Sequence, residues 1–594
     1  MSTSYVTIAE YLFKRLHQLG VDSICGVPGD YNLTLLDYIE PAGINWVGTC
    51  NELNAAYAAD GYARVNGIGA VVTTFGVGEL SAVNAIAGAR AEKVPVCHIV
   101  GKPSRSAEHD RALIHHTLND GEYNTFARMQ AHITVAQAYL VDSRTACEEI
   151  DRVLRQCLLR SRPVYISIPV DMVPVKVSIE RLESRIVLDD AALPKDSNIV
   201  LSMVRELMYK CTQPAILVDG ESRAFGALQE IETLVRETGW PTFTSVFGKS
   251  LVDESLPNVQ GVWMGNFAPL AQAEFFNSCD LILCFGPHFS RTNTFRNNAI
   301  PPREKTIAFT EMDIHIKSQI YRDLPIKAAL TELSKTLDVS ALHKYPVYPN
   351  LDAHARSEHV VTTPSSSAQI MHSQLWSRIS SILRPGDIIL AETGTAGYGS
   401  HALRLPTSTH LFKPVTWLSI GYMLPAALGA AIARRDMLKK KSRVNELENT
   451  RSTPSGRTIL FIGDGSFQMT AQELSTIIHQ RLDVLVVLIS NDGFTIERCI
   501  HGRHQKYNDV APWRYLDLPK AFGADSLVSE GYASRTCQLR TQADLDAWLQ
   551  DEDMLLLKGR GLRMVEIFMG KLDAPKPILQ MLEEQMHRER KTAV

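Results

Sequence analysis

Short runs of apolar residues alternate with longer stretches of helical periodicity along most of the chain. Between Val6 and Val177 the apolar runs are rich in Val and Ile, which is typical of buried strands. Strands that alternate with helices in this way form parallel sheets with helices on both faces. The runs that carry this prediction are 23–27, 70–74, 96–100 and 164–168.

The same alternation recurs twice more, which predicts an α/β protein with three parallel-sheet α/β domains. A second block, from about Asn198 to Leu342, contains apolar runs at 214–218 and 281–285. A third block follows a polar segment rich in Ser, Thr, Pro and His, a composition typical of a linker. We therefore expect domains at 1–182, 195–345 and 368–575, a linker at 346–367 and a helical tail at 576–594.

Two turns in the third block carry oxygen-bearing side chains. A Gly-Asp-Gly-Ser turn containing Asp464 follows the apolar run 458–462, and an Asn-Asp-Gly turn starting at Asn491 follows the run 484–489. Helical spacing at 470–480 indicates a crossover, so both turns lie at the same edge of a parallel sheet, where such sheets bind ligands. Either turn alone would be an ordinary connection. Because Mg²⁺ prefers a few protein oxygens together with water and phosphate, the pair predicts a diphosphate held through a metal ion.

Composition excludes several classes of protein. The chain has 594 residues, of which 45% are hydrophobic and 21% charged, as in a globular protein with a large core. Its net charge of −4 provides no excess of positive charge with which to bind nucleic acid. No apolar run could span a membrane, and neither a signal peptide nor a Cys-x-x-Cys pair is present, so we expect a reduced cytoplasmic protein. We interpret the polar stretch Arg434–Arg457 as an exposed insertion.

The two turns resemble the signature of thiamine-diphosphate enzymes, and the three-block order resembles their 2-oxo-acid decarboxylase branch, the pyruvate and indolepyruvate decarboxylase family. The resemblance covers nearly the whole chain. It implies a pyrimidine-binding, a middle and a diphosphate-binding domain, with active sites between two subunits of a dimer or a dimer of dimers (a homotetramer). It also implies that Asp464, Asn491 and the Gly493 carbonyl bind Mg²⁺ and that Gly465 and Ser466 adjoin the thiamine diphosphate. One local departure is Ser490, where the family often has a first asparagine.

Five further residues match catalytic positions of the resembled family. Glu52 lies between an apolar strand end and an Ala-rich helix, and it matches the glutamate that activates the cofactor's pyrimidine ring. Taken alone, it would be an ordinary first-turn helix glutamate. Asp30, the pair His115 and His116, and Glu497 match the groups that carry protons to and from the bound intermediates, and imidazoles titrate near neutral pH.

Two loops match cofactor-binding segments. Thr393 and Thr395 lie in a Glu-Thr-Gly-Thr turn that resembles the loop holding the pyrimidine and the diphosphate. Ile420 lies where the family has the apolar residue that bends the cofactor, although a core isoleucine would look the same. Leu418 replaces the glycine usual in the family, so its side chain is expected to crowd the site while its carbonyl accepts from the cofactor amine.

The resemblance predicts non-oxidative decarboxylation of a 2-oxo acid to an aldehyde and CO₂. Thr292 and Gly397 stand where pyruvate-preferring relatives often have larger residues, and Ile496 completes the expected substrate pocket. Smaller residues lining the pocket leave room for a longer substrate side chain, which favours branched or aromatic 2-oxo acids. The alternatives are a carboligase, a non-catalytic homologue and a Rossmann dehydrogenase, for which no convincing Gly-x-Gly-x-x-Gly follows the first strand.

Overall fold

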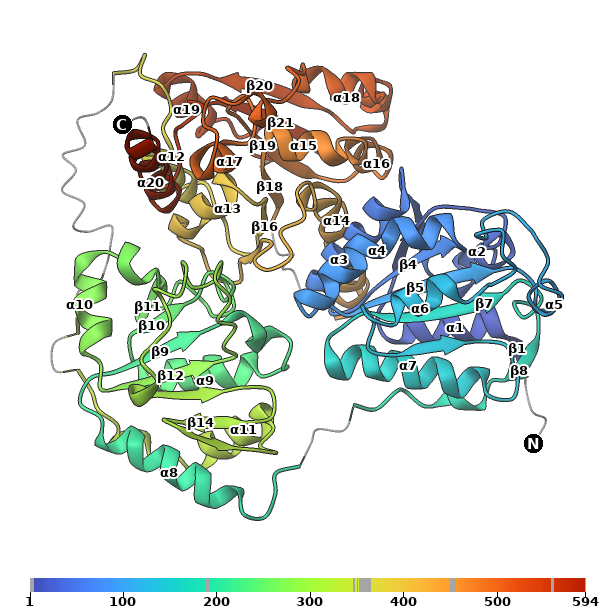
Figure 1. Cartoon of the computed structure of the whole chain (residues 1–594), viewed down its shortest axis with the longest axis horizontal. Coiled ribbons are helices and arrows are strands. Elements are labelled where there is room, and N and C mark those ends of the chain that lie inside the picture. The colour runs from blue at the N-terminus through green and yellow to red at the C-terminus, as the bar shows by residue number, and fades with distance from the viewer. Residues whose placement is uncertain are drawn as a thin grey trace.

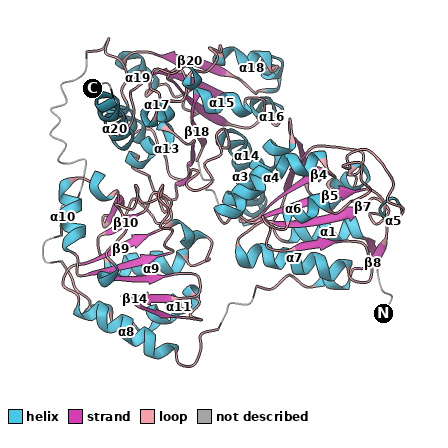
Figure 2. Cartoon of the chain, in the orientation of Figure 1, coloured by secondary structure: helices cyan, strands magenta, loops and turns pink. Residues whose placement is uncertain are grey.

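The computed structural model of the chain describes residues 5–188, 192–345, 348–349, 351, 365–448, 456–556 and 560–592. Three α/β lobes follow one another along the chain. The N-terminal lobe (blue) lies beside the C-terminal lobe (orange to red), and the middle lobe (green) lies against the C-terminal one (Figure 1). Helices flank the strands of each lobe (Figure 2). The predicted α/β class with three domains is confirmed.

The N-terminal lobe is built on a six-stranded parallel sheet of order β3-β2-β4-β5-β7-β6. Strands β2, β4, β5 and β7 are fully buried, which is why they lack polar alternation, whereas the edge strands β3 and β6 are only partly buried. Its strands are β2 (Ser23–Gly26), β3 (Asn45–Gly48), β4 (Gly69–Thr74), β5 (Val96–Lys102), β6 (Gln137–Tyr139) and β7 (Val164–Pro169), and its longer helices are α1 (Ile8–Gln18), α3 (Glu52–Asn66), α4 (Val77–Ala91) and α7 (Ala146–Arg160). A short antiparallel pair, β1 (Tyr5–Thr7) and β8 (Lys176–Ser178), joins its two ends.

The middle lobe has a seven-stranded sheet of order β11-β10-β9-β12-β13-β14-β15. Five strands are parallel, and the last two, β14 and β15, are antiparallel, so this sheet is mixed at one edge. The strands are β9 (Pro214–Val218), β10 (Thr242–Thr244), β11 (Val259–Val262), β12 (Leu281–Phe285), β13 (Thr306–Phe309), β14 (Ile314–Ile316) and β15 (Gln319–Tyr321), with helices α8 (Ser197–Lys210), α9 (Leu228–Thr238), α10 (Leu270–Ser278) and α11 (Ile326–Thr336).

The C-terminal lobe has a six-stranded parallel sheet of order β17-β16-β18-β19-β21-β20. The strands are β16 (Ile388–Ala391), β17 (His410–Phe412), β18 (Thr458–Gly463), β19 (Val484–Ser490), β20 (Arg535–Leu539) and β21 (Leu562–Phe568). The helices are α12 (His372–Ser380), α13 (Thr395–Gly399), α14 (Met423–Glu448), α15 (Asp464–Thr470), α16 (Glu473–His479), α17 (Thr495–Ile500), α18 (Leu518–Ala521), α19 (Gln542–Trp548) and α20 (Lys576–Thr592).

One sequence interpretation changes here, and another lies mostly outside the described residues. Residues 434–448 are the C-terminal part of helix α14, and Asp436 is buried and accepts a hydrogen bond from Ser23 in the N-terminal lobe. The start of the expected insertion is therefore packed structure, while 449–455 lie outside the described residues. Most of the expected linker, including 352–364, also lies outside them.

Helices α3 and α14 join the N-terminal and C-terminal lobes through a close contact. Both helices are rich in Ala and Gly. An added Cβ at Gly61 would overlap the Ala426 carbonyl, and one at Gly429 would overlap the Ala58 carbonyl. Small residues at these positions let the two backbones touch, so the lobes share one buried core.

Candidate active site

The carboxyl ends of β18 and β19 carry the predicted oxygen pair. The two strands are parallel neighbours with Gly463 opposite Ile489, so Asp464 and Asn491 emerge together. The Asp464 carboxylate is buried and accepts backbone hydrogen bonds from Gly465 at 2.7 Å and from Asn491 and Gly493 at 3.1 Å each. The two turns thus form one structural unit.

The chemistry of this unit fits a hard divalent cation. The side-chain oxygen of Asn491 is buried and has no hydrogen-bond partner among the described residues, which is costly unless a ligand satisfies it. Burial raises the pKa of the Asp464 carboxyl to about 6, and a bound cation would favour its ionised form. Gly493 has φ of 127°, and a Cβ there would overlap the Asn508 carbonyl, so glycine is required at this position.

Glu392 holds two predicted cofactor loops together, a role that sequence reasoning missed. Its buried carboxylate accepts hydrogen bonds from the backbone of Thr393 at 2.8 Å and of Met423 at 2.9 Å. Desolvation raises the pKa of Glu392 to about 7. The available signal was an acid placed directly after the apolar run 388–391. Thr470 adds a hydrogen bond to the Gly421 carbonyl at 2.7 Å.

Replacement of Glu392 by Gln is expected to flatten the pH dependence of stability between about pH 4.5 and 7. The unfolded carboxyl ionises near 4.5 whereas the folded one keeps its proton to about 7, so its contribution is fully present below pH 4.5 and decreases as pH rises to 7. The shift corresponds to a change on the order of 3 kcal/mol. Thermal melts at a series of pH values measure it. The exposed Glu304→Gln serves as control, and an unchanged pH profile in Glu392→Gln would disprove the assignment.

The loop that carries Leu418 and Ile420 packs on the N-terminal lobe of the same chain. Leu418 has φ of 54°, the left-handed region that a glycine adopts without strain, so the backbone has a glycine-like conformation with a larger side chain. Its side chain lines a small cavity beside Tyr57 and Trp417. Ser419 shares a 2.6 Å hydrogen bond with the Tyr57 hydroxyl. Ile420 is half-buried.

Asp30, His115 and His116 form a cluster in the N-terminal lobe. The His115 Nε2 lies 2.5 Å from the Asp30 carboxylate, and Tyr31 stacks on the His115 ring at a centroid distance of 4.9 Å. The two imidazoles lie edge to face at 4.7 Å. One ligand-type atom from each of the three residues lies within 4.8 Å of the others. Because Asp30 and His115 are exposed, this cluster is open to solvent or to another molecule.

Glu52 is connected to this cluster through a glycine-containing turn. It is the first residue of α3, capped by the Asn51 side chain. A Cβ at Gly78 would lie 3.0 Å from the Glu52 carboxylate oxygen, and a Cβ at Gly76 would overlap the His116 carbonyl. Glycines at both positions let the turn pass between Glu52 and His116. The N-terminal lobe therefore brings four of the five predicted catalytic residues into one region.

Glu497 and Ile496 lie on the short helix α17 in the C-terminal lobe. Glu497 is exposed, whereas Ile496 is half-buried and lies near Gly394, whose added Cβ would be 3.7 Å from it. Helix α20 packs on α17 through Cys499 and Ile578 (Figure 1). Thr395 is the first residue of α13 and is buried.

The two residues expected to widen the substrate pocket have different surroundings. Thr292 is half-buried in a loop of the middle lobe. Gly397 lies inside α13, and a Cβ there would be 2.9 Å from the Glu392 carbonyl. Packing against the end of β16 therefore restricts residue size at Gly397, independently of any substrate.

One chain holds two separate groups of site residues. Among the described residues, no hydrogen bond or ion pair joins Glu52 or the histidines to Asp464, Asn491 or Glu497. The amide of Cys50, near Glu52, instead bonds to Glu473 at 3.0 Å. We define the first group as the N-terminal half-site (Asp30, Glu52, His115, His116) and the second as the C-terminal half-site (Thr393, Thr395, Leu418, Ile420, Asp464, Gly465, Ser466, Asn491, Gly493, Ile496, Glu497).

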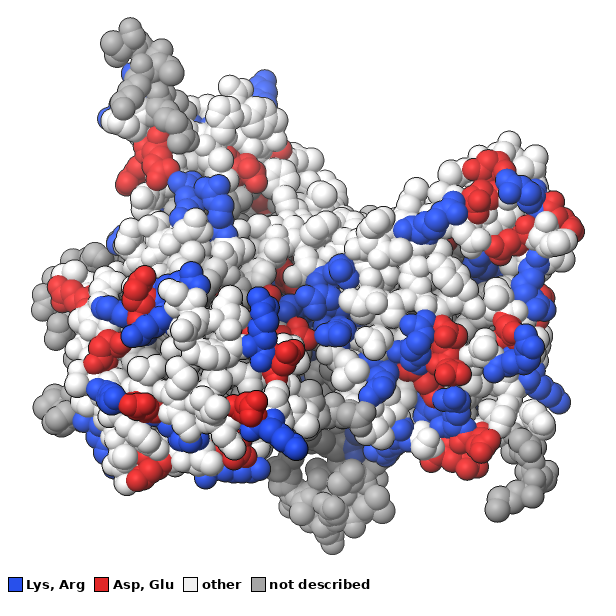
Figure 3. Space-filling view, turned by 60° about the horizontal axis from the view of Figure 1, so that its bottom comes forward, with Lys and Arg blue, Asp and Glu red and all other residues white. Residues whose placement is uncertain are grey.

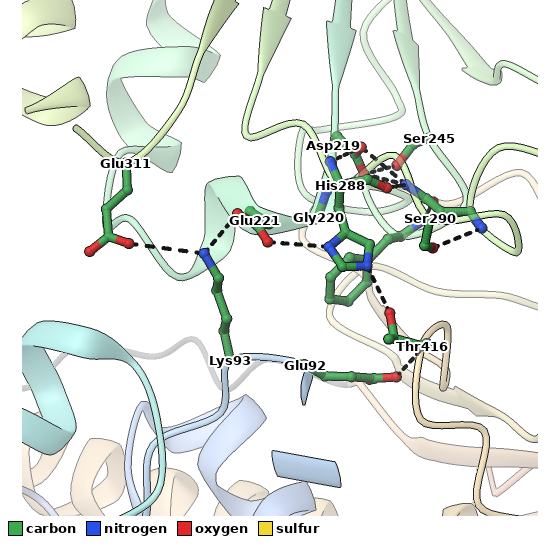
Figure 4. Close-up of polar contacts among 12 residues, drawn as sticks. Glu92, Lys93, Asp219, Gly220, Glu221, Ser245, His288, Ser290, Glu311 and Thr416 are labelled. Carbon is green, nitrogen blue, oxygen red and sulfur yellow. Dashed lines mark hydrogen bonds and ion pairs between the residues drawn. The ribbon is translucent and has the colours of Figure 1, made fainter. Parts of the chain in front are cut away.

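All three lobes meet at Thr416, two residues before Leu418 (Figure 4). Lys93 pairs with Glu221 at 2.7 Å, and Glu221 contacts His288 at 3.2 Å, so Glu221 raises the pKa of His288. The other ring nitrogen of His288 lies 2.8 Å from the Thr416 hydroxyl. Glu92 accepts from the Thr416 backbone at 3.0 Å, two residues before Leu418. An ion pair thus connects the middle lobe to the N-terminal lobe, and a hydrogen bond from each of these lobes holds Thr416.

On the surface outside the candidate site, acidic and basic residues are intermixed. The face drawn in Figure 3 shows Lys and Arg interspersed with Asp and Glu over both visible lobes. No helix among the described residues is long and apolar enough to cross a membrane.

Comparisons with known proteins agree with this geometry. Residues 6–124 match the model of the thiamine pyrophosphate enzyme N-terminal TPP binding domain, residues 201–337 that of the central domain, and residues 392–552 that of the C-terminal TPP binding domain. The chain is 55% identical to pyruvate decarboxylase of Aspergillus parasiticus, with 99% of each chain covered.

More distant relatives extend the comparison. Pyruvate decarboxylase of Aspergillus fumigatus is 40% identical over 96% of each chain, and pyruvate decarboxylase isozyme 3 of Saccharomyces cerevisiae is 36% identical over 98% of each. A solved structure, the thiamine diphosphate-dependent 4-hydroxybenzoylformate decarboxylase of Rhodococcus jostii RHA1, has the same fold. Its TM-score is 0.73 at 18% identity, covering 95% of this chain and 99% of that one.

Proposed function

This chain belongs to the thiamine pyrophosphate enzyme family as a 2-oxo-acid decarboxylase, and we propose that it converts pyruvate or a larger branched or aromatic 2-oxo acid to an aldehyde and CO₂ with Mg²⁺ as its metal. The observation that carries the metal is the buried Asp464 carboxylate beside the unpartnered Asn491 oxygen. We further propose a cytoplasmic protein, which the ten free cysteines support.

The C-terminal half-site would hold the cofactor's diphosphate end. Asp464, Asn491 and the Gly493 carbonyl would bind Mg²⁺, with Gly465 and Ser466 at the diphosphate. When bound, the cofactor supplies a thiazolium electron sink for loss of CO₂. Thr393, Thr395, the Leu418 carbonyl and the Ile420 side chain would orient its pyrimidine, and Glu392 keeps their two loops in register through the 2.8 and 2.9 Å hydrogen bonds.

The N-terminal half-site would hold and transfer protons. Glu52 would hold a proton at the pyrimidine, which its place at the start of α3 and beside Gly78 supports. His115, oriented by Asp30 on one side and stacked on Tyr31, would exchange a proton with the bound substrate. His116 and Glu497 would complete the path to the product.

The separation of the half-sites supports a catalytic dimer, or a dimer of dimers, in which each active site takes Glu52 from one subunit and Asp464 from the other. Two inactive variants, Glu52→Gln and Asp464→Asn, test this arrangement. In a hybrid dimer, one site would contain both intact residues and the other neither, so about half of the wild-type activity should return.

Co-expression with two different affinity tags isolates the hybrid, and each variant alone is the control. A site formed within one chain would leave both sites of the hybrid defective. Absence of recovery in a purified hybrid that keeps the native mass would therefore contradict a shared site.

Substrate size is proposed to depend on Thr292. Replacement by Leu should lower kcat/KM for phenylpyruvate or indolepyruvate by about tenfold more than for pyruvate, because a longer wall removes volume from the larger substrate. Aldehyde release from a panel of 2-oxo acids measures the ratio, and pyruvate is the internal control. Equal effects on all substrates would show that Thr292 does not line the pocket.

A further inference from the structure

A second chemically unusual group lies between the middle and C-terminal lobes and shares no residue with either half-site. Lys413 follows the edge strand β17, and it is only 5% exposed. Its amine has no hydrogen-bond partner among the described residues. A buried ammonium without a partner is strongly disfavoured, so the fold must either neutralise it or supply an anion.

The nearby groups favour a neutral amine. Lys249 is also buried, but it already bonds to Glu254 at 2.8 Å and to the Leu403 carbonyl at 2.9 Å. That pair leaves no free carboxylate for Lys413. Burial and the Lys249 charge lower the pKa of Lys413 well below its ordinary value. The unprotonated amine of a lysine is a nucleophile.

His401 is the fourth member of this group, which we name the Lys413 cluster (Lys249, Glu254, His401, Lys413). Burial and the charge of Lys249 lower the pKa of His401 well below its ordinary value, so the ring is neutral. Its Nδ1 has no partner among the described residues. Before any reaction, the cluster therefore holds one cation, Lys249, and one anion, Glu254.

Two cavities adjoin the cluster. One, of about 590 Å³, is lined by Glu254 and by Phe412, the residue before Lys413. The other, of about 540 Å³, is lined by Glu254, His401 and Leu403. A small uncharged molecule can approach such a site without the desolvation cost of an ion.

We propose that Lys413 is a carbamylation site that reacts reversibly with CO₂. The amine nitrogen forms a bond to the carbon of CO₂, one C–O π pair moves to oxygen, and the nitrogen's proton goes to His401. No oxidant or reductant is needed. The product cluster holds two cations, Lys249 and His401, and two anions, Glu254 and the carbamate, so its net charge does not change. Decarboxylation supplies CO₂, but the reaction needs no turnover.

Trapping with triethyloxonium in ¹³CO₂-equilibrated buffer, followed by peptide mass spectrometry, tests the proposal on the full-length protein. At pH 7.4 an ordinary lysine has only about one amine in 10³ unprotonated. Lys413 should therefore carry on the order of 100-fold more ethyl carbamate than the exposed Lys317 or Lys335, and the excess should vanish after unfolding in urea. Labelling of Lys413 no greater than theirs would overturn the proposal.

Two further experiments distinguish carbamylation of Lys413 from other roles of this lysine. His401→Phe keeps an aromatic ring but removes the proton acceptor, so trapping at Lys413 should fall at least about tenfold while a neutral acylating reagent still modifies the amine. An unchanged yield would refute the proton transfer. Suppression of trapping by inorganic phosphate at constant ionic strength would identify an anion site and overturn the proposal. None of these measurements requires catalysis. A negative result would therefore count against carbamylation of Lys413 and not against the decarboxylase assignment.

Discussion

Glu52→Gln is expected to lower the rate of aldehyde release by about 10² to 10⁴, the range typical of a lost acid–base group. Gln has nearly the same shape as Glu and leaves the Asn51 cap of α3 in place, but it cannot exchange a proton. Thermal stability should change little because Glu52 is only half-buried. Initial rates with saturating thiamine diphosphate and Mg²⁺ measure the effect.

The exposed Glu40, in the same lobe, offers a matched control. Glu40→Gln removes the same charge and should retain full activity. A rate for Glu52→Gln within twofold of this control would eliminate Glu52 as the activating carboxyl.

Asp464→Asn is expected to weaken Mg²⁺-dependent binding of thiamine diphosphate by about 100-fold or more, since it removes an anionic metal ligand. The substitution also changes a hydrogen-bond acceptor that receives three backbone N–H groups into one that can accept fewer. Equilibrium dialysis with and without Mg²⁺ separates cofactor binding from catalysis.

Asp492 provides a close comparison, because it is adjacent in sequence to Asn491 but its side chain is 74% exposed. Asp492→Asn should bind cofactor like the wild type. If both variants bound the cofactor equally well, the metal assignment at Asp464 would be wrong, whatever their activities.

The parallel-sheet lobes could be predicted because each strand is a continuous apolar run separated from the next by a helix. The meeting of Asp464 and Asn491 followed from topology alone, since parallel neighbours end at one edge. The antiparallel strands β14 and β15 carry no such signal, because they are three residues long and only partly apolar.

The role of Glu392 and the contacts of His288 could not be read from the sequence. Both depend on tertiary approach: Glu392 reaches the amide of Met423, thirty-one positions away, and His288 reaches Thr416 in another lobe. The expected insertion at 434–457 was misjudged at its start because a mostly charged sequence conceals the buried Asp436. A polar sequence indicates that one face of a helix is exposed to solvent. It does not indicate where the helix ends.

The close α3–α14 contact has a mechanical consequence for a shared active site. Helix α3 begins at Glu52, and α14 begins just after the Leu418 loop, so in the proposed catalytic dimer the two ends of this helix pair would serve two different active sites. Because the backbones touch at Gly61 and Gly429, a shift of Glu52 in one site would be transmitted as a shift of the loop in the other. The α3–α14 pair would therefore couple the two active sites mechanically, so that closure of one site opposes or promotes closure of the other.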